Sequence, residues 1–335
     1  FGARKMQMVP GYEQATIRVD PTGSVLVMAG THSHGQGHAT TYAQIVADEL
    51  GVLPERVQVR EGDTDLVPHG WGTFASRSIV SAGGAIQKAA GMVRDEMRAI
   101  AAHLLEASVD DVELSEGRLG VRGSPASSIS VEEIARVAHH GADRLPPGLG
   151  RGLEATSDFD PDGTYSNAAH CAVVEVDPET GEVHLVRYVV VEDCGVMINP
   201  MVVDGQVAGG VVQGIGSALL EQLVHDSEGQ PLTTSLIDYL VPMATDVPTI
   251  DIEHLVTPTT RSASGAKGMG EGGTIGSPAA ILNAVNDALS GRGQVTSLPI
   301  RPPDVLAAIE AGRHAGDITT SAVAPTGASI LEVHT

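Results

Sequence analysis

The chain has 335 residues and a formal net charge of −22, with 42% hydrophobic and 19% charged residues. Because this length exceeds that of a typical single domain, two packed lobes are expected. The negative charge argues against nucleic acid and anionic membrane surfaces as partners. No apolar run reaches the roughly 20 residues that a membrane helix requires. Residues 1–5 do not form a signal peptide, and a cytoplasmic location is the expectation.

Cysteine is scarce, since only Cys171 and Cys194 are present. The chain alone therefore cannot build an iron–sulfur cluster or a four-cysteine zinc site, and any such centre must come from a partner. Aromatic residues make up only 3%, whereas 40 residues are glycine. The core is expected to consist of Val, Ile, Leu and Ala, with many places where backbone approaches backbone or a ligand. The chain also lacks an initiator Met, which suggests a segment of a longer protein.

Two hairpins are predicted by alternating apolar and polar residues on either side of a turn. The first joins strands at residues 15–20 and 24–29, and the second joins strands at 172–176 and 182–191. The sequence Val-Asp-Pro opens both turns, which suggests a weak internal duplication. Helical periodicity is present in four further segments, namely residues 41–50, 84–105, 131–138 and 277–289.

These elements predict an α+β fold with two related lobes of mixed or antiparallel sheet flanked by helices. A stretch rich in Pro and Gly at residues 145–152 is the candidate boundary. The first lobe then covers residues 1–150 and the second covers 151–312. Residues 313–335 are rich in Ala, Thr, Ser and Gly, and we predict an irregular tail there.

Two glycine-rich stretches lie in the first lobe. Gly35-Gln36-Gly37-His38 stands between a strand and a helix, where backbone N–H groups and a positive helix end suit an anion. Thr40 occupies the position of a third glycine, so the stretch is not a dinucleotide fingerprint, and a tight turn with an exposed Gln is the alternative. Residues 70–78 combine short hydroxyl side chains with Arg77 and could line a polar pocket, or form an ordinary loop with a paired Arg.

Two more glycine-rich stretches lie in the second lobe. In residues 204–216, each glycine would weaken a helix by about 1 kcal/mol, so close packing against a ligand or another backbone must compensate. In residues 265–276, six glycines surround Glu271, which could serve as a general base. Ser277 then resembles an N-cap and Pro278 a first helical residue. Tight helix packing without function and a flexible surface loop are the respective alternatives.

Two other kinds of site were weighed. His32, His34 and His38 could converge on zinc, although no acidic or cysteine partner is near in sequence. Ser264 and Lys267 have the spacing of some serine hydrolases, but that motif belongs at a helix start rather than within a glycine run.

Taken together and in this order, the four stretches resemble the molybdopterin-binding region of the molybdenum hydroxylase large subunits. This family includes xanthine dehydrogenase, aldehyde oxidase and aerobic carbon monoxide dehydrogenase. The resemblance extends over about residues 10–312, which makes it more specific than any single motif.

The resemblance implies a cofactor site for molybdopterin, expected in its cytosine dinucleotide form, with molybdenum held by the cofactor's dithiolene and not by the protein. Gln36 and Gln206 would contact the pterin or its extension, residues 73–78 would wrap it, and Glu271 would be the catalytic base beside the metal. The implied cofactor-binding residues are Gly35, Gln36, Gly37, His38, Thr73, Phe74, Ala75, Ser76, Arg77, Ser78, Gln206, Lys267, Gly268, Met269 and Gly270.

The resemblance also implies a reaction and partners. The enzyme would hydroxylate an aldehyde, a purine or another N-heterocycle with oxygen from water, or oxidise carbon monoxide. Electrons would leave through iron–sulfur clusters on a small subunit and FAD on a medium subunit. The N-terminal half of the large subunit would complete the pocket, and a dimer of such heteromers is expected. The alternative is a folded, non-catalytic fragment or assembly module without cofactor.

Overall fold

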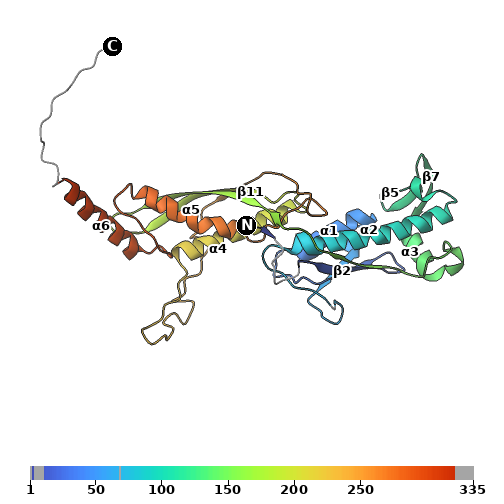
Figure 1. The fold of residues 1–335 in the computed structure, drawn as a ribbon, viewed down its shortest axis with the longest axis horizontal. Coiled ribbons are helices and arrows are strands. Elements are labelled where there is room, and N and C mark those ends of the chain that lie inside the picture. The colour runs from blue at the N-terminus through green and yellow to red at the C-terminus, as the bar shows by residue number, and fades with distance from the viewer. Residues whose placement is uncertain (1, 4–10, 68, 321–335) are drawn as a thin grey trace, which may run out of the picture. The chain divides into compact units, whose positions relative to one another are not determined.

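The computed structural model describes residues 2–3, 11–67 and 69–320 (Figure 1). The chain divides into two compact units, and neither is one continuous segment. Unit 1 contains residues 1–168, 191–208 and 253–272, and unit 2 contains residues 169–190, 209–252 and 273–335. The segment that carries Glu271 therefore belongs to the same unit as the N-terminal sheet.

Unit 1 is built on a four-stranded sheet with the order β4-β3-β2-β8. The strands are β2 (Glu13–Val19), β3 (Val25–Ala29), β4 (Val57–Glu61) and β8 (Leu153–Phe159). Strands β2 and β3 are antiparallel neighbours, which confirms the first predicted hairpin. Strand β4 pairs in parallel with β3, as the crossover through a helix requires.

The turn-rich stretch at residues 145–152 does not separate two sheets. Strand β8 follows it directly and pairs antiparallel with β2 along its whole length. Pro and Gly at these positions therefore mark a reversal of the chain within unit 1, where the sequence suggested a boundary between lobes. Proline and glycine signal a turn, but they carry no information about which strand the returning chain will join.

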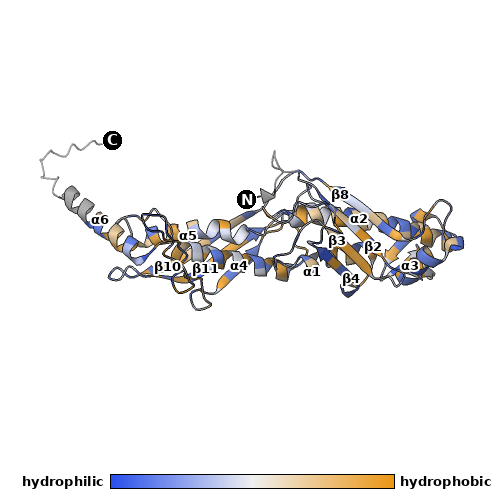
Figure 2. Cartoon of the chain, turned by 90° about the horizontal axis from the view of Figure 1, so that it is seen from below, coloured by the Kyte–Doolittle hydropathy of each residue, from blue (hydrophilic) through white to orange (hydrophobic). Residues whose placement is uncertain are grey.

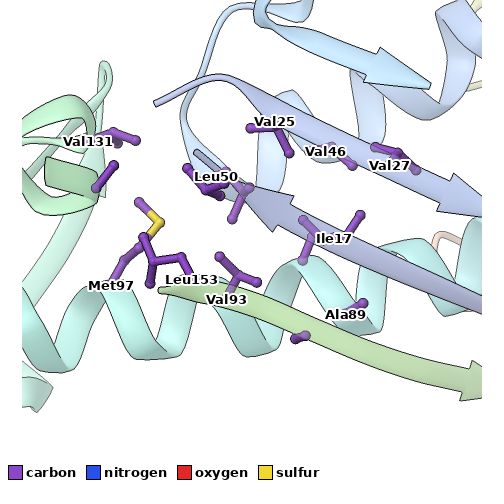
Figure 3. Packing of buried hydrophobic residues seen from close by; sticks show 14 of the residues in the cluster. Ile17, Val25, Val27, Val46, Leu50, Ala89, Val93, Met97, Val131 and Leu153 are labelled. Atoms are coloured by element: carbon purple, nitrogen blue, oxygen red, sulfur yellow. The ribbon is translucent and has the colours of Figure 1, made fainter. Parts of the chain in front are cut away.

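Two helices cover the buried face of this sheet. Helix α1 (His38–Leu50) connects β3 to β4, and α2 (Ser78–Leu104) packs along β2 and β8. Strand β3 consists of hydrophobic residues, whereas β2 alternates the buried Ala15, Ile17 and Val19 with polar residues (Figure 2). Figure 3 shows Met97 of α2 beside Leu153 of β8, with Ile17 of β2 further along the same buried cluster, and all three side chains are fully buried. Burial of each such side chain stabilises the fold by about 1.5–3 kcal/mol.

A small antiparallel sheet follows α2 and consists of β5 (Val112–Ser115), β6 (Arg118–Val121) and β7 (Ser124–Ser130). Helix α3 (Val131–His140) begins directly afterwards, and the Ser130 hydroxyl accepts a hydrogen bond from the Glu133 amide at 3.2 Å as its N-cap. Strands β1 (Gly2–Ala3) and β9 (Thr164–Tyr165) form a separate antiparallel pair. Three single turns of 3-10 helix, at Pro54–Arg56, Val109–Asp111 and Ala142–Arg144, join these elements.

The remaining strands are β10 (Asn167–Val176), β11 (Val183–Asp193) and β12 (Ile250–His254), in the order β10-β11-β12.

The turns of the two predicted hairpins have the same hydrogen-bond pattern. In the first, the Asp20 carboxylate accepts the amides of Thr22 and Ser24, and in the second, Asp177 accepts those of Glu179 and Thr180. Both aspartates thus organise an Asx turn, which is the local basis of the repeated Val-Asp-Pro pattern.

Three helices complete the chain, namely α4 (Pro200–Leu219), α5 (Gly272–Ala288) and α6 (Pro302–Thr320). Within unit 2, α4 and α5 pack at van der Waals distance through small residues. A Cβ atom added at Gly210 would lie 2.9 Å from the Gly273 Cα, and one added at Gly214 would lie 2.8 Å from the Ser277 Cβ. The glycines at residues 209–216 therefore belong to a helix, and close packing offsets their low helix propensity.

Two predicted helix limits require correction. Ser277 and Pro278 lie inside α5, not at its start. Pro278 has no N–H for the Thr274 carbonyl, and the Ser277 hydroxyl contacts that carbonyl at 3.5 Å. Helix α6 extends to Thr320, so residues 313–320 are helical where the sequence predicted an irregular tail, as a continuation of the helix that begins at Pro302. Residues 321–335 lie outside the described residues.

No helix in the described parts of the chain is long and apolar enough to cross a membrane.

Candidate active site

A cavity of about 560 Å³ lies within unit 1 and is lined by four separate segments of the chain. These segments are residues 34–42, 73–79, 194–206 and 266–271, of which not every residue reaches the cavity. The volume lies within the range of about 300–1,000 Å³ that is typical of sites for small molecules and cofactors.

The first wall is the turn that leads into α1. The Gln36 side-chain oxygen accepts hydrogen bonds from the Ser33 hydroxyl, at 3.4 Å, and from the His34 amide. Its nitrogen lies 3.0 Å from His38 Nε2, and His38 Nδ1 lies 2.9 Å from the buried Glu61 carboxylate. This chain of contacts fixes the orientation of the Gln36 amide. Since an amide nitrogen carries two hydrogens, one remains for a ligand in the cavity.

The second wall has a strained backbone. Ala75 and Ser76 adopt φ values of 50° and 55°, in the left-handed region that residues other than glycine rarely occupy. The buried Glu13 carboxylate stabilises this segment, because it bonds the Arg77 guanidinium and accepts the Trp71 amide at 3.0 Å. The Arg77 guanidinium donates further to the Gly72 carbonyl, at 2.9 Å. Strain at adjacent residues that is supported by a buried ion pair is typical of functional sites.

Glu271 lies directly against this strained segment. The Ser76 hydroxyl donates a hydrogen bond of 2.8 Å to Glu271 Oε2 and accepts one of 3.1 Å from the Glu271 amide. The close approach depends on Gly268, because a Cβ atom there would lie 1.9 Å from the Ser76 carbonyl oxygen. The glycines around Glu271 thus let two distant segments of the chain touch.

The loop that carries Glu271 is anchored at its beginning. Ala266 forms an isolated β-bridge with Gly195, and the Lys267 amide donates to the Cys194 carbonyl at 2.7 Å. The buried Lys267 ammonium lies 3.2 Å from the Asp193 carboxylate. Burial alone would raise the pKa of Asp193, but hydrogen bonds from Thr257, the Gly195 amide and Lys267 lower it to about 2. Lys267 is therefore held by a carboxylate and is not arranged to activate Ser264.

A second carboxyl group is buried behind the loop. Glu192 is fully buried, and neither of its carboxyl oxygens has a hydrogen-bond partner among the described residues. Burial, and secondarily the charge of Asp193, raises the pKa of Glu192 to about 7. This carboxyl group packs against Gly272, where an added Cβ atom would lie 2.8 Å from Glu192 Oε2.

Four helices begin at the rim of the cavity. His38 and Ser78 are the first residues of α1 and α2, Asn199 precedes α4, and Glu271 precedes α5. The Asn199 side chain accepts the Val202 amide at 3.1 Å in the manner of an N-cap. Each helix N-terminus carries a partial positive charge and unpaired N–H groups, so their convergence makes the cavity favourable for an anionic group.

Most of the residues singled out in the sequence line this one cavity. Three do not, because Gly37 is the N-cap of α1, Arg77 points to Glu13, and Gly268 packs on Ser76. The residues that do are Gly35, Gln36, His38, Thr73, Phe74, Ala75, Ser76, Ser78, Gln206, Lys267, Met269, Gly270 and Glu271.

Sequence reasoning missed the wall at residues 194–203, which includes Cys194, Met197 and Asn199. One signal was available, because Asn199-Pro200 is the N-cap and first-turn pair that commonly starts a helix. The zinc alternative finds no support in the geometry, since the described residues contain no group of three His, Cys, Asp or Glu side chains that could hold a metal ion.

An α+β fold with a cavity of this kind defines a cofactor-binding domain. The model of the molybdopterin cofactor-binding domain matches residues 1–248. The large subunit of nicotine 6-hydroxylase from Paenarthrobacter nicotinovorans is 44% identical, over 89% of this chain and 37% of its own length. The carbon monoxide dehydrogenase large chain of Hydrogenophaga pseudoflava is 40% identical, over 83% of this chain and 34% of its own.

A solved structure supports the same assignment. Quinoline 2-oxidoreductase from Pseudomonas putida 86 superposes with a TM-score of 0.85 at 43% identity, over 89% of this chain and 38% of that one. The chain belongs to the molybdenum hydroxylase family. It spans well under half the length of the relatives that it matches.

Proposed function

We propose that the cavity binds molybdopterin with its molybdenum, in the cytosine dinucleotide form, and that Glu271 is the general base of a hydroxylation reaction. The observation that carries the proposal is the position of the Glu271 carboxylate on the wall of a cavity that four helix N-termini surround. Membership of the molybdopterin-binding family supports it.

The residues of the cavity fit such a group. Molybdopterin carries phosphate, and the helix N-termini and the free amide hydrogen of Gln36 supply donors for it. Gly35 has open space where a Cβ atom would stand, so a ligand can approach the backbone there. We infer that Gln36, Gln206, His38 and residues 73–78 hold the cofactor. In this scheme Arg77 acts indirectly, by fixing the backbone of the second wall through Glu13.

When bound, the molybdenum centre would accept two electrons from the substrate, and water would supply the oxygen that the product gains. The residues of this chain would handle the proton. Among the described residues, Ser76 bonds Glu271 Oε2, so Oε1 is the atom available to accept a proton from a group in the cavity. A carboxylate can act as a base only within hydrogen-bond reach of the proton that it removes, and the position of Glu271 on the cavity wall supports this role.

For the substrate, we propose an aromatic N-heterocycle. Nicotine 6-hydroxylase and quinoline 2-oxidoreductase, two of the most similar proteins, are named for such compounds. We further infer that the chain works with the remainder of a large subunit, an iron–sulfur small subunit and an FAD-containing medium subunit. The relatives are described as a large subunit and a large chain, which supports an assembly of this kind.

The test is expression of the complete large subunit with its partners, followed by measurement of molybdenum, released nucleotide and hydroxylation of quinoline and nicotine in ¹⁸O-labelled water. Glu271→Gln is expected to keep the molybdenum content and to lower kcat by at least about 1,000-fold, at the upper end of general-base effects. Glu228→Gln, a change at an exposed carboxylate in unit 2, is the matched control.

The outcomes separate the alternatives. An assembled complex without molybdenum would favour the non-catalytic module, and a Glu271→Gln variant with wild-type turnover would refute the role of the base. The proposal is supported if the product carries ¹⁸O from water and if Glu271→Gln loses turnover while Glu228→Gln keeps it.

A further inference from the structure

The contact between Ser76 and Glu271 is reciprocal. One hydroxyl group donates to the carboxylate at 2.8 Å and accepts from the amide of the same residue at 3.1 Å. The side chain and the backbone of Glu271 are therefore both tied to a single atom. A carboxylate with free rotation about its side-chain bonds would sample several rotamers, whereas two bonds to one hydroxyl select one of them.

The group that supplies this hydroxyl is itself firmly held. The Ser76 backbone is in the left-handed region, with φ at 55°, one residue before Arg77, whose guanidinium is fixed by Glu13. Gly268 packs directly on the Ser76 carbonyl from the other side. A left-handed backbone is unfavourable in a residue other than glycine, and it persists only where the surrounding structure enforces it.

We propose that Ser76 is a positioning residue for Glu271, with its hydroxyl holding Oε2 and the backbone so that Oε1 is presented to the cavity. This inference rests on the proposed function of Glu271. It separates Ser76 from the neighbouring residues of the second wall, because its hydroxyl serves the base, whereas the Ser78 hydroxyl donates to Thr73 at 3.0 Å.

Two variants at residue 76 test the role of the hydroxyl in the assembled complex. Ser76→Gly removes the hydroxyl and is compatible with the left-handed backbone. Ser76→Thr keeps a hydroxyl but is β-branched, so it tests rescue at some cost in stability. Ser81→Ala is the matched control, because Ser81 lies five residues further along the chain in α2, donates to the Arg77 carbonyl at 2.9 Å and does not line the cavity.

We expect Ser76→Gly to lower kcat by about 10–100-fold with KM changed less than about 2-fold, since misplacement of a catalytic group by 1 Å costs about 100-fold in rate. Ser76→Thr should recover most of this loss, and Ser81→Ala should match the wild type. An infrared difference spectrum against Glu271→Gln, at fixed pH, isolates the carboxylate bands of Glu271. The antisymmetric stretch should shift in Ser76→Gly and return in Ser76→Thr.

The infrared bands distinguish positioning from a merely structural role. An unmoved carboxylate band in Ser76→Gly, with or without loss of molybdenum, overturns the inference. Wild-type kcat in Ser76→Gly beside an inactive Glu271→Gln also overturns it, while the proposed base survives. If Glu271→Gln itself remains active, the proposed function has failed and the role of Ser76 fails with it.

Discussion

Two stretches of nearly equal glycine content take different structures in this chain. Residues 205–216 are entirely helical within α4, whereas residues 265–271 form the loop that carries Glu271 before α5 begins. In α4, Gly210 and Gly214 allow a second helix to approach. In the loop, Gly265 adopts a φ of 79°, and Gly268 allows the backbone of Ser76 to approach.

The difference teaches that glycine density predicts close approach but not the conformation in which the approach occurs. A glycine lowers helix stability by about 1 kcal/mol, and packing of this size readily outweighs it. The two stretches differ in the segment that packs against them. Helix α5 packs against α4, whereas the strained segment with Ser76 packs against the loop. Substitution of a glycine in the loop therefore tests catalysis, whereas substitution of a glycine in α4 tests stability.

Among the glycine substitutions, the largest effect is expected at Gly268. In Gly268→Ala, the new methyl group would lie 1.9 Å from the Ser76 carbonyl oxygen, and the loop with Glu271 would have to move. We expect kcat of the complex to fall by at least about 100-fold, because the base would be displaced. Gly150→Ala, where no atom lies within 4 Å of the new methyl group, is the control. Wild-type kcat in Gly268→Ala would show that the contact between the two segments is dispensable.

A smaller effect, on stability rather than rate, is expected in α4. Gly214→Ala would place a methyl group 2.8 Å from the Ser277 Cβ and 3.2 Å from the Pro278 Cδ, so α5 would be pushed away. Overpacking of this kind costs about 1–3 kcal/mol. Gly209→Ala, on an exposed position with open space, should instead stabilise α4 by up to about 1 kcal/mol. Thermal unfolding of the complex measures both, and equal shifts in the same direction would contradict the packing that we describe.

The smallest effect concerns Glu192, which packs against Gly272 at the end of the loop. Its folded pKa of about 7 exceeds its ordinary value of 4.5, so the folded state binds more protons than the unfolded state between these values. Stability should therefore fall as pH rises through this window, and Glu192→Gln should flatten that dependence. Melting temperatures of both forms from about pH 5 to about pH 8 measure the slopes. Parallel curves would show that Glu192 titrates normally.

The local elements were largely predictable from the sequence. The β2–β3 hairpin follows from alternation around a Pro-Thr-Gly turn, and α1 and α3 follow from helical periodicity. Helix α2 begins at Ser78, before the predicted residue 84, because its first residues include serine, β-branched and glycine residues, which are weak helix formers that packing stabilises. A Cβ atom at Gly84 would lie 2.3 Å from the Phe159 ring, and this tight contact with β8 has no local signature.

The candidate site was predictable as a set of stretches but not as a geometry. Glycine density and the lone carboxylate identified three of the four segments that line the cavity and, of the segment at residues 194–206, only Gln206; their cofactor contacts stay a prediction. The bond between Ser76 and Glu271 joins residues 195 positions apart, and no periodicity or turn signal encodes such a pairing. The ion pair of Arg77 with Glu13 was equally hidden, since an arginine among hydroxyl residues is as easily explained by a bound anion.

The distribution of the cavity walls along the chain also governs the order of events during biosynthesis. The first wall residue is His34 and the last is Glu271. A chain that leaves the ribosome from its N-terminus can form the β2–β3 hairpin early, but the cavity stays open on one side until residue 271 has emerged. Insertion of a ligand that needs all four walls must therefore wait until residue 271 has emerged, long after the residues of the β2–β3 hairpin have left the ribosome.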